Sequence, residues 1–225
     1  MYQVTWPPDH LVTSLPIYPL TMVLTYLIIF ITAAISAFAM SNEELFTKLR
    51  FNAYDVKHSN QWYRFFTYGF LHAGYVHLFI NMLVLYSFGV IVESYFKIYC
   101  PQKAGLYYIL LYVGGLILSI IPSYGKHKND VFYNAVGASG AVAAVVFASI
   151  ILYPAGKIYL FLIPVPIPAP VFGVLYVAYE YYMAKNSRDN IGHDAHLWGA
   201  LFGLVFTIAL KPGLVWIFLQ QIGVM

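Results

Sequence analysis

The sequence predicts an all-α, polytopic membrane protein in which six transmembrane helices form a single domain over residues 1–225. Composition is the first observation, because 61% of the residues are hydrophobic, 9% are charged and the mean hydropathy is +0.71. A soluble domain carries about 25% charged residues. The second observation is that the apolar residues fall into runs close to the length that crosses the hydrocarbon core of a bilayer. A lipid bilayer is therefore the expected surrounding.

The six predicted spans, in order, are residues 17–40, 75–93, 105–122, 139–153, 168–183 and 195–210. The fourth and sixth are short for full crossings, which is tolerated where protein and water surround the end of a span. The fifth is expected to start after the segment 163–170, because a proline at every second residue excludes a helix there. No strands are predicted.

The remaining segments differ in character. Residues 1–16 form an N-terminal segment, and residues 212–225 an apolar tail that is expected to lie at the interface. Residues 41–70 are rich in aromatic side chains, which favours a folded loop at the membrane surface. Residues 186–194 are polar, and we expect them to form a mobile loop over the functional site.

Charge and residue counts exclude several function classes. The net charge of +3 is spread out without a basic stripe, so nucleic-acid binding has no support. The single cysteine, Cys100, excludes an internal disulfide framework. The seven histidines show no HExxH spacing and carboxylates are few, so neither a metal site nor a cofactor is expected.

Ser139 lies between Gly137 and Gly140 at the start of the fourth span. A hydroxyl at a helix N-terminus lies beside free backbone N–H groups and the positive end of the helix dipole, which suits a nucleophile that attacks a carbonyl. The alternative is a small residue that serves helix packing.

His196 is the predicted base for this serine. It precedes Gly199 and Gly203, whose GxxxG spacing allows the sixth span to approach the fourth closely. A structural histidine is the alternative. His193 is a competing base, but we expect it to be a solvated loop residue. Because Asp194 does not face His196, the sequence predicts a Ser-His dyad without a carboxylate.

Three further polar residues accompany the second span. His77 and Asn81 are spaced i, i+4 on one helical face and can donate hydrogen bonds to an oxyanion. A buried polar pair that ties helices together is the alternative. His72, near the start of the span, is expected to anchor the interface or to support the site. Arg64 and Glu93 are expected to have structural roles near the membrane surface.

Together these residues resemble the motifs of the rhomboid intramembrane serine proteases. Tyr63-Arg64 is similar to the family's Trp-Arg motif, His72, His77 and Asn81 to HxxxxHxxxN, Gly137–Gly140 to GxSG, and Ala195–Gly203 to AHxxGxxxG. The resemblance implies a six-helix bundle with a water-filled cavity, Ser139 as nucleophile and His196 as base. His77, Asn81 and the Ser139 amide would form the oxyanion site. Single-span membrane proteins would be the substrates.

One position departs from the family. Many rhomboids have an aromatic residue four positions after the serine, beneath the histidine ring, where this chain has Ala143. An inactive rhomboid-like protein that binds client helices is the alternative function, and a transporter is a weaker one because paired broken spans are lacking.

The expected location is the bacterial inner membrane. Loop charges alone favour an external N-terminus, whereas the resemblance implies an internal one with the site open to the outside. We follow the resemblance, because the long loop 41–70 distorts the charge count.

Overall fold

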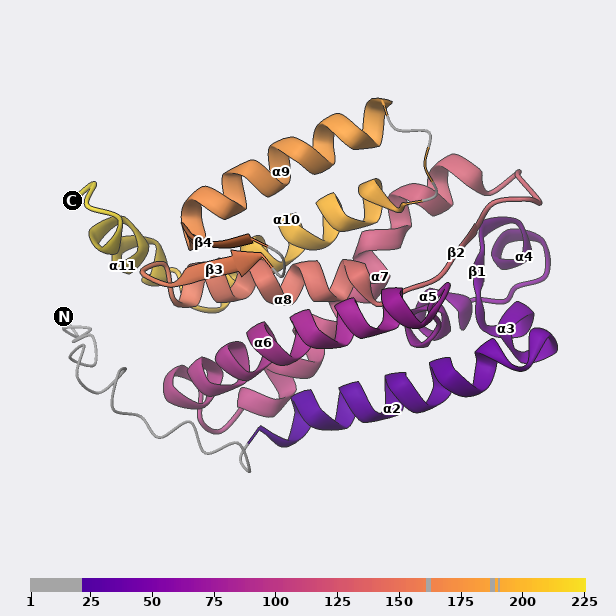
Figure 1. The fold of residues 1–225 in the computed structure, drawn as a ribbon, viewed down its shortest axis with the longest axis horizontal. Coiled ribbons are helices and arrows are strands. Elements are labelled where there is room, and N and C mark those ends of the chain that lie inside the picture. The colour runs from indigo at the N-terminus through magenta and orange to yellow at the C-terminus, as the bar shows by residue number, and fades with distance from the viewer. Residues whose placement is uncertain (1–21, 161–162, 187–188, 190) are drawn as a thin grey trace.

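The computed structural model describes residues 22–160, 163–186, 189 and 191–225. Six long helices lie side by side in it (Figure 1): α2 (Val23–Met40), α6 (Tyr75–Tyr99), α7 (Ala104–His127), α8 (Ser139–Leu152), α9 (Ala169–Asn186) and α10 (His193–Leu210). Each predicted span corresponds to one of these helices. The predicted segment 1–16 and the first residues of the first span lie outside the described residues.

Four of the six helices are long and apolar enough to cross a membrane, namely α2, α6, α7 and α10. Helix α8 has only 14 residues, and α9, which is long enough with 18 residues, is not among the candidate spans. The chain is therefore a mostly helical integral membrane protein with four candidate spans among the described residues, and the count of six crossings remains a prediction.

The prediction that the chain has no strands is wrong. Strand β1 (Phe51–Asn52) pairs antiparallel with β2 (Asn134–Ala135), and β3 (Lys157–Leu160) pairs antiparallel with β4 (Ile163–Pro168). Strand β4 holds the alternating prolines. Because side chains and N–H groups alternate along a strand, prolines at every second position all fall on one edge and leave the other edge able to pair. The segment Ile163–Pro168 is not helical, as predicted, but α9 starts at Ala169, so the predicted exclusion of a helix is wrong for residues 169 and 170. Pro170 lies in the first turn of α9, where a missing N–H costs no helical hydrogen bond.

The segment between α2 and α6 is folded. It contains the short helices α3 (Glu43–Leu49), α4 (Ala53–His58) and α5 (Arg64–Thr67) and the 3-10 helix Tyr68–Phe70. Asn42 and Asn52 cap α3 and α4, because their side chains accept hydrogen bonds from Leu45 N (3.0 Å) and Asp55 N (2.9 Å). Strand β1 pairs with β2 and so holds this segment against the loop that precedes α8.

Helix α8 lies at the centre of the bundle, where it packs against α6, α7 and α10. Every residue of α8 except Ser139 is buried. A helix that is apolar on all sides is stable only when neighbours cover it completely. The core therefore surrounds α8 and leaves its first residue as the accessible one.

One end of the bundle collects the polar loops. The end of α2, the start of α6, the end of α7, the start of α8, the end of α9 and the start of α10 all meet there, on the right in Figure 1. The β3–β4 hairpin and the terminal helix α11 (Leu214–Gln221) lie at the opposite end. Ser139, His77 and His196 are each close to the first of these two ends.

Candidate active site

Ser139 begins α8 at an uncapped helix end. The preceding residue, Ala138, makes no side-chain capping bond, and the first hydrogen bond of this helix runs from Val142 N to Ala138 O at 2.9 Å. The N–H groups of Ser139 and Gly140 precede that bond, so they have no partner within the helix. A hydroxyl and free backbone donors thus coincide at the positive end of a buried helix.

The backbone before Ser139 requires glycine. Gly137 has a φ of +123°, in the region that favours glycine, and a Cβ there would lie 3.0 Å from Cε1 of His77. Its N–H donates to Tyr68 O at 3.1 Å, which fixes the loop to the folded segment before α6. The His77 ring therefore lies directly beside the chain that enters the serine.

Glycines bring α8 and α10 into backbone contact. A Cβ added at Gly199 would collide with the carbonyl oxygen of Gly140, and one at Gly203 with that of Ala144. A Cβ at Gly140 would lie 3.4 Å from Ala195 O and would collide with the Ser119 side chain. These contacts set the first turn of α8 against the first turn of α10, which carries His196.

His196 is bound to a carboxylate, so the predicted absence of a carboxylate from the site is wrong. Its Nδ1 lies 3.1 Å from Oε1 of Glu180, a residue of α9 that is 4% exposed. Among the described residues, no hydrogen bond joins Ser139 to His196. Hydrogen bonds between catalytic groups are often long without substrate and shorten when it binds.

The prediction of a solvated His193 is also wrong. His193 is 4% exposed, and its Nδ1 lies 2.6 Å from Oε2 of Glu180. Helix α10 starts at His193, two residues earlier than predicted, so His193 and His196 are spaced i, i+3 and share the face toward α9. Asp194 instead pairs with Lys126 at 3.6 Å. The predicted mobile loop 186–194 lies partly outside the described residues, and its last two residues belong to α10.

Glu180, His193 and His196 could also hold a metal ion, because one ligand atom from each lies within 4.8 Å of the others. Two helices bring the three together, which a search for motifs along the sequence does not detect. Within the group, both Glu180 oxygens and the Nδ1 atoms of His193 and His196 already take part in hydrogen bonds.

A signal for Glu180 exists in the sequence. It lies inside the predicted fifth span, and ionisable residues within spans are rare and are candidates for a functional site. The partner carboxylate of His196 comes from the adjacent helix and not from its neighbours along the chain.

The predicted oxyanion residues lie on α6. Asn81 is 6% exposed and its amide donates to His77 O at 3.0 Å, which leaves its second N–H available. His72 is fully buried, with Nδ1 3.2 Å from Ser36 Oγ and its ring centroid 5.0 Å from that of His77. Burial, and then the charge of His77, lowers the pKa of His72 to about 3. His72 is therefore neutral, and its ring packs edge to face against the ring of His77.

Ala143 is buried one turn beyond Ser139, in an apolar cluster with Phe147 and Ala200. The position where the resemblance implies an aromatic ring under His196 thus carries a methyl group. His196 is held by the carboxylate on α9 instead.

Arg64 and Glu93 lie at opposite ends of the bundle, and in the described structure they do not contact each other. Arg64 donates to Thr47 O at 2.8 Å and pairs with Asp55 at 3.3 Å. Glu93 accepts from Thr25 N at 3.0 Å and pairs with Lys97 at 3.3 Å. Arg64 therefore stabilises the folded segment before α6, and Glu93 links the start of α2 to the end of α6.

The chain is similar in sequence to proteins of one known family. A model of the Rhomboid domain matches residues 59–213. The chain is 27% identical over 158 residues to RHOMBOID-like protein 12, mitochondrial, of Arabidopsis thaliana, which covers 65% of the chain and 46% of that protein. It is 31% identical over 145 residues to Rhomboid protein 1, mitochondrial, of Saccharomyces cerevisiae, covering 61% of the chain and 38% of that protein.

A bacterial relative is similar over a longer stretch. The chain is 25% identical over 177 residues to Rhomboid protease AarA of Providencia stuartii, which covers 70% of the chain and 59% of that protein. The chain thus spans less than two thirds of the length of each of these relatives.

Proposed function

The chain belongs to the rhomboid family, and from this we propose that it is an intramembrane serine endopeptidase that cleaves single-span membrane proteins in or near their transmembrane segment. The observation that carries the proposal is the position of Ser139. It is the one accessible residue of an otherwise buried helix, and it stands at an uncapped N-terminus beside the helix that carries His196. One relative is itself named a protease.

In the proposed reaction His196 Nε2 takes the proton from Ser139 Oγ as the oxygen attacks the scissile carbonyl. The negative charge that develops on the carbonyl oxygen is stabilised by the Ser139 N–H, with His77 and Asn81 as further donors. The protonated His196 then gives its proton to the leaving amine. Water, activated by the same imidazole, hydrolyses the acyl-enzyme and restores the serine.

The chain is an integral membrane protein by its apolar helices and its family. The bacterial inner membrane, expected from the sequence, gains no support from the comparisons, because two of the relatives carry mitochondrial names. The orientation in which the polar end faces outward remains part of the proposal.

The test is cleavage of a model single-span substrate by the purified full chain in liposomes. Wild type should cut the substrate, and Ser139→Ala should abolish cutting while the fold persists. Ser149→Ala is the matched control, because Ser149 is a buried serine of the same helix whose hydroxyl donates to Val146 O at 2.7 Å. It should cut like wild type.

Two results would count against the proposal. Cutting by Ser139→Ala that stops on addition of a chelator would point to metal-dependent hydrolysis. Binding of the substrate helix by wild type without any cutting would favour the alternative of an inactive rhomboid-like protein, since Ser139 and His196 are not hydrogen-bonded to each other in the described structure.

A further inference from the structure

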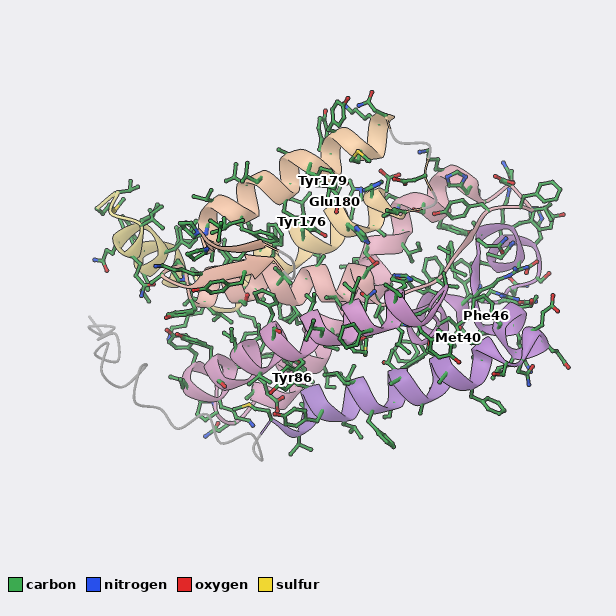
Figure 2. All side chains as sticks on the ribbon, in the orientation of Figure 1. Met40, Phe46, Tyr86, Tyr176, Tyr179 and Glu180 are labelled. Carbon is green, nitrogen blue, oxygen red and sulfur yellow. The ribbon has the colours of Figure 1, made fainter. Side chains whose placement is uncertain are left out.

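Glu180 is a buried carboxylate on a helix that is otherwise largely exposed. Among the described residues of α9, the buried ones are Ala169, Gly173 and Glu180. Glu180 lies between α9 and α10 (Figure 2), where its two oxygens contact different histidines. Burying a carboxylate is costly unless it is paired and hydrogen-bonded. These two histidines therefore satisfy it.

His193 supplies the balancing charge. Its Nδ1 lies 2.6 Å from Glu180 Oε2, and its Nε2 lies 3.3 Å from a carboxylate oxygen of Asp189. A histidine with an acceptor at each ring nitrogen donates from both, which only the cationic form can do. His193 thus pairs with Glu180 and leaves Oε1 to accept a hydrogen bond from His196.

That hydrogen bond determines the tautomer of His196. A carboxylate accepts but does not donate, so His196 Nδ1 carries the proton in the 3.1 Å contact. A neutral imidazole has one ring proton, so Nε2 is left bare. The bare nitrogen is the one that a general base needs in order to take the proton of Ser139.

We propose that Glu180 is a positioning residue that holds His196 with Nδ1 protonated and Nε2 free to act on Ser139, an inference that rests on the proposed function of those two residues. The chain has Ala143 where an aromatic ring would support the histidine, and the hydrogen bond that His196 donates to Glu180 on α9 replaces that support. Fixing the tautomer of a catalytic histidine is the role of the carboxylate in serine-protease triads.

A purely structural role is the alternative, in which Glu180 only ties α9 to α10. The two roles differ in what a substitution changes. Loss of a structural tie lowers the thermal stability and the amount of folded enzyme. Loss of the preference for a protonated Nδ1 on His196 lowers kcat, while the enzyme stays folded and its KM is unchanged.

The experiment compares Glu180→Leu, which keeps the size but removes the acceptor, with Glu180→Gln, which keeps one acceptor. Kinetics are measured on folded protein in detergent. Glu180→Leu should lower kcat by roughly 10²- to 10⁴-fold, the range that general base catalysis contributes. KM should stay within a factor of about three. Glu180→Gln should recover part of the loss.

The matched control is Glu93→Gln. Glu93 and Glu180 are the two buried carboxylates among the described residues, and Glu93 lies at the opposite end of the bundle. Glu93→Gln should lower the melting temperature without changing kcat. A normal kcat in folded Glu180→Leu would overturn the proposal.

Nuclear magnetic resonance of ring-¹⁵N-labelled histidine provides a readout that does not depend on activity. His196, assigned by its loss in His196→Gln, should have a protonated Nδ1 and a bare Nε2 in wild type and should lose this preference in Glu180→Leu. A protonated Nε2 in wild type would overturn the positioning role. If wild type cleaves no substrate, the proposed function fails, whereas the tautomer of His196 still decides the role of Glu180.

Discussion

The backbone contact between α8 and α10 can be tested by adding one methyl group at Gly203. A Cβ there would collide with the carbonyl oxygen of Ala144 and would lie 2.6 Å from its Cα and 2.7 Å from its carbonyl carbon. Atoms of the main chain cannot rotate away as side-chain ends do. The two helices must therefore move apart by roughly 1 Å to restore ordinary contact distances.

This displacement has two expected consequences. Forcing an extra methyl group into a packed core costs about 1–3 kcal/mol, which lowers the melting temperature by roughly 2–12 °C for a chain of this size. The displacement also moves His196 relative to Ser139. A misplacement of about 1 Å between reacting groups lowers the rate by on the order of 10²-fold.

The assay measures thermal unfolding and substrate cleavage by Gly203→Ala in the same detergent. Gly125→Ala is the matched control, because Gly125 is a glycine inside α7 with nothing within 4 Å of the added Cβ. In an open helix alanine is favoured over glycine by about 0.5–1 kcal/mol, so the control should be as stable as wild type or more so. A Gly203→Ala protein that melts and cleaves like wild type would refute the steric coupling of the two helices.

Three further outcomes follow from the site. Asn81→Ala should lower kcat by about 10²-fold with little change in KM, because the proposed bond forms mainly in the transition state; an equal loss of substrate binding would indicate a structural role. His72 is neutral in the folded protein because burial lowers its pKa to about 3. As the pH falls, the His72 side chain of the unfolded chain is therefore protonated at a higher pH than that of the folded protein, which favours unfolding. Stability should fall as the pH drops below about 6.5, by at most about 2 kcal/mol at pH 5. Melting curves should show a smaller acid loss in His72→Gln, and equal losses would argue against a buried neutral ring. Arg64→Lys should destabilise the protein, since one lysine nitrogen cannot replace the three guanidinium nitrogens that contact Gln61 Oε1, the carbonyls of Thr47 and Arg50, and Asp55; an unchanged melting temperature would contradict that role.

The helices were predictable from the sequence because their apolar runs are long and bounded by polar or proline-rich segments. The residues at which the helices begin and end were less predictable. Helix α6 continues to Tyr99 and α7 to His127, beyond the residues predicted as spans. Pro122 lies within α7, although proline usually ends a helix. Hydropathy marks the part of a helix that suits hydrocarbon, whereas the backbone stays helical into the polar layer.

Strands β1 and β2 had no signal in the sequence. Each has two residues, and their pairing joins positions 51–52 to 134–135, which only the bundle brings together. Strand β4 does have a signal in the sequence, because alternating prolines are compatible with an edge strand as well as incompatible with a helix.

The candidate site was predictable where the residues lie within short motifs. Gly137, Ser139 and His196 could be found by spacing. The association of Glu180 with His193 and His196 could not, because it depends on how α9 packs against α10. Glu180 is separated from His196 by a polar connection and lies on another helix. A burial pattern along α9 gives no guidance, because so few of its residues are buried.

Covalent labelling with a fluorophosphonate, located by mass spectrometry, tests most directly whether Ser139 is a nucleophile activated by His196. Wild type should gain one adduct, on the peptide that contains Ser139. The adduct should be absent from Ser139→Ala, strongly reduced in His196→Gln and unchanged in Ser149→Ala. An unlabelled wild type, or an adduct on another residue that persists in Ser139→Ala, would contradict the assignment of this serine as the nucleophile.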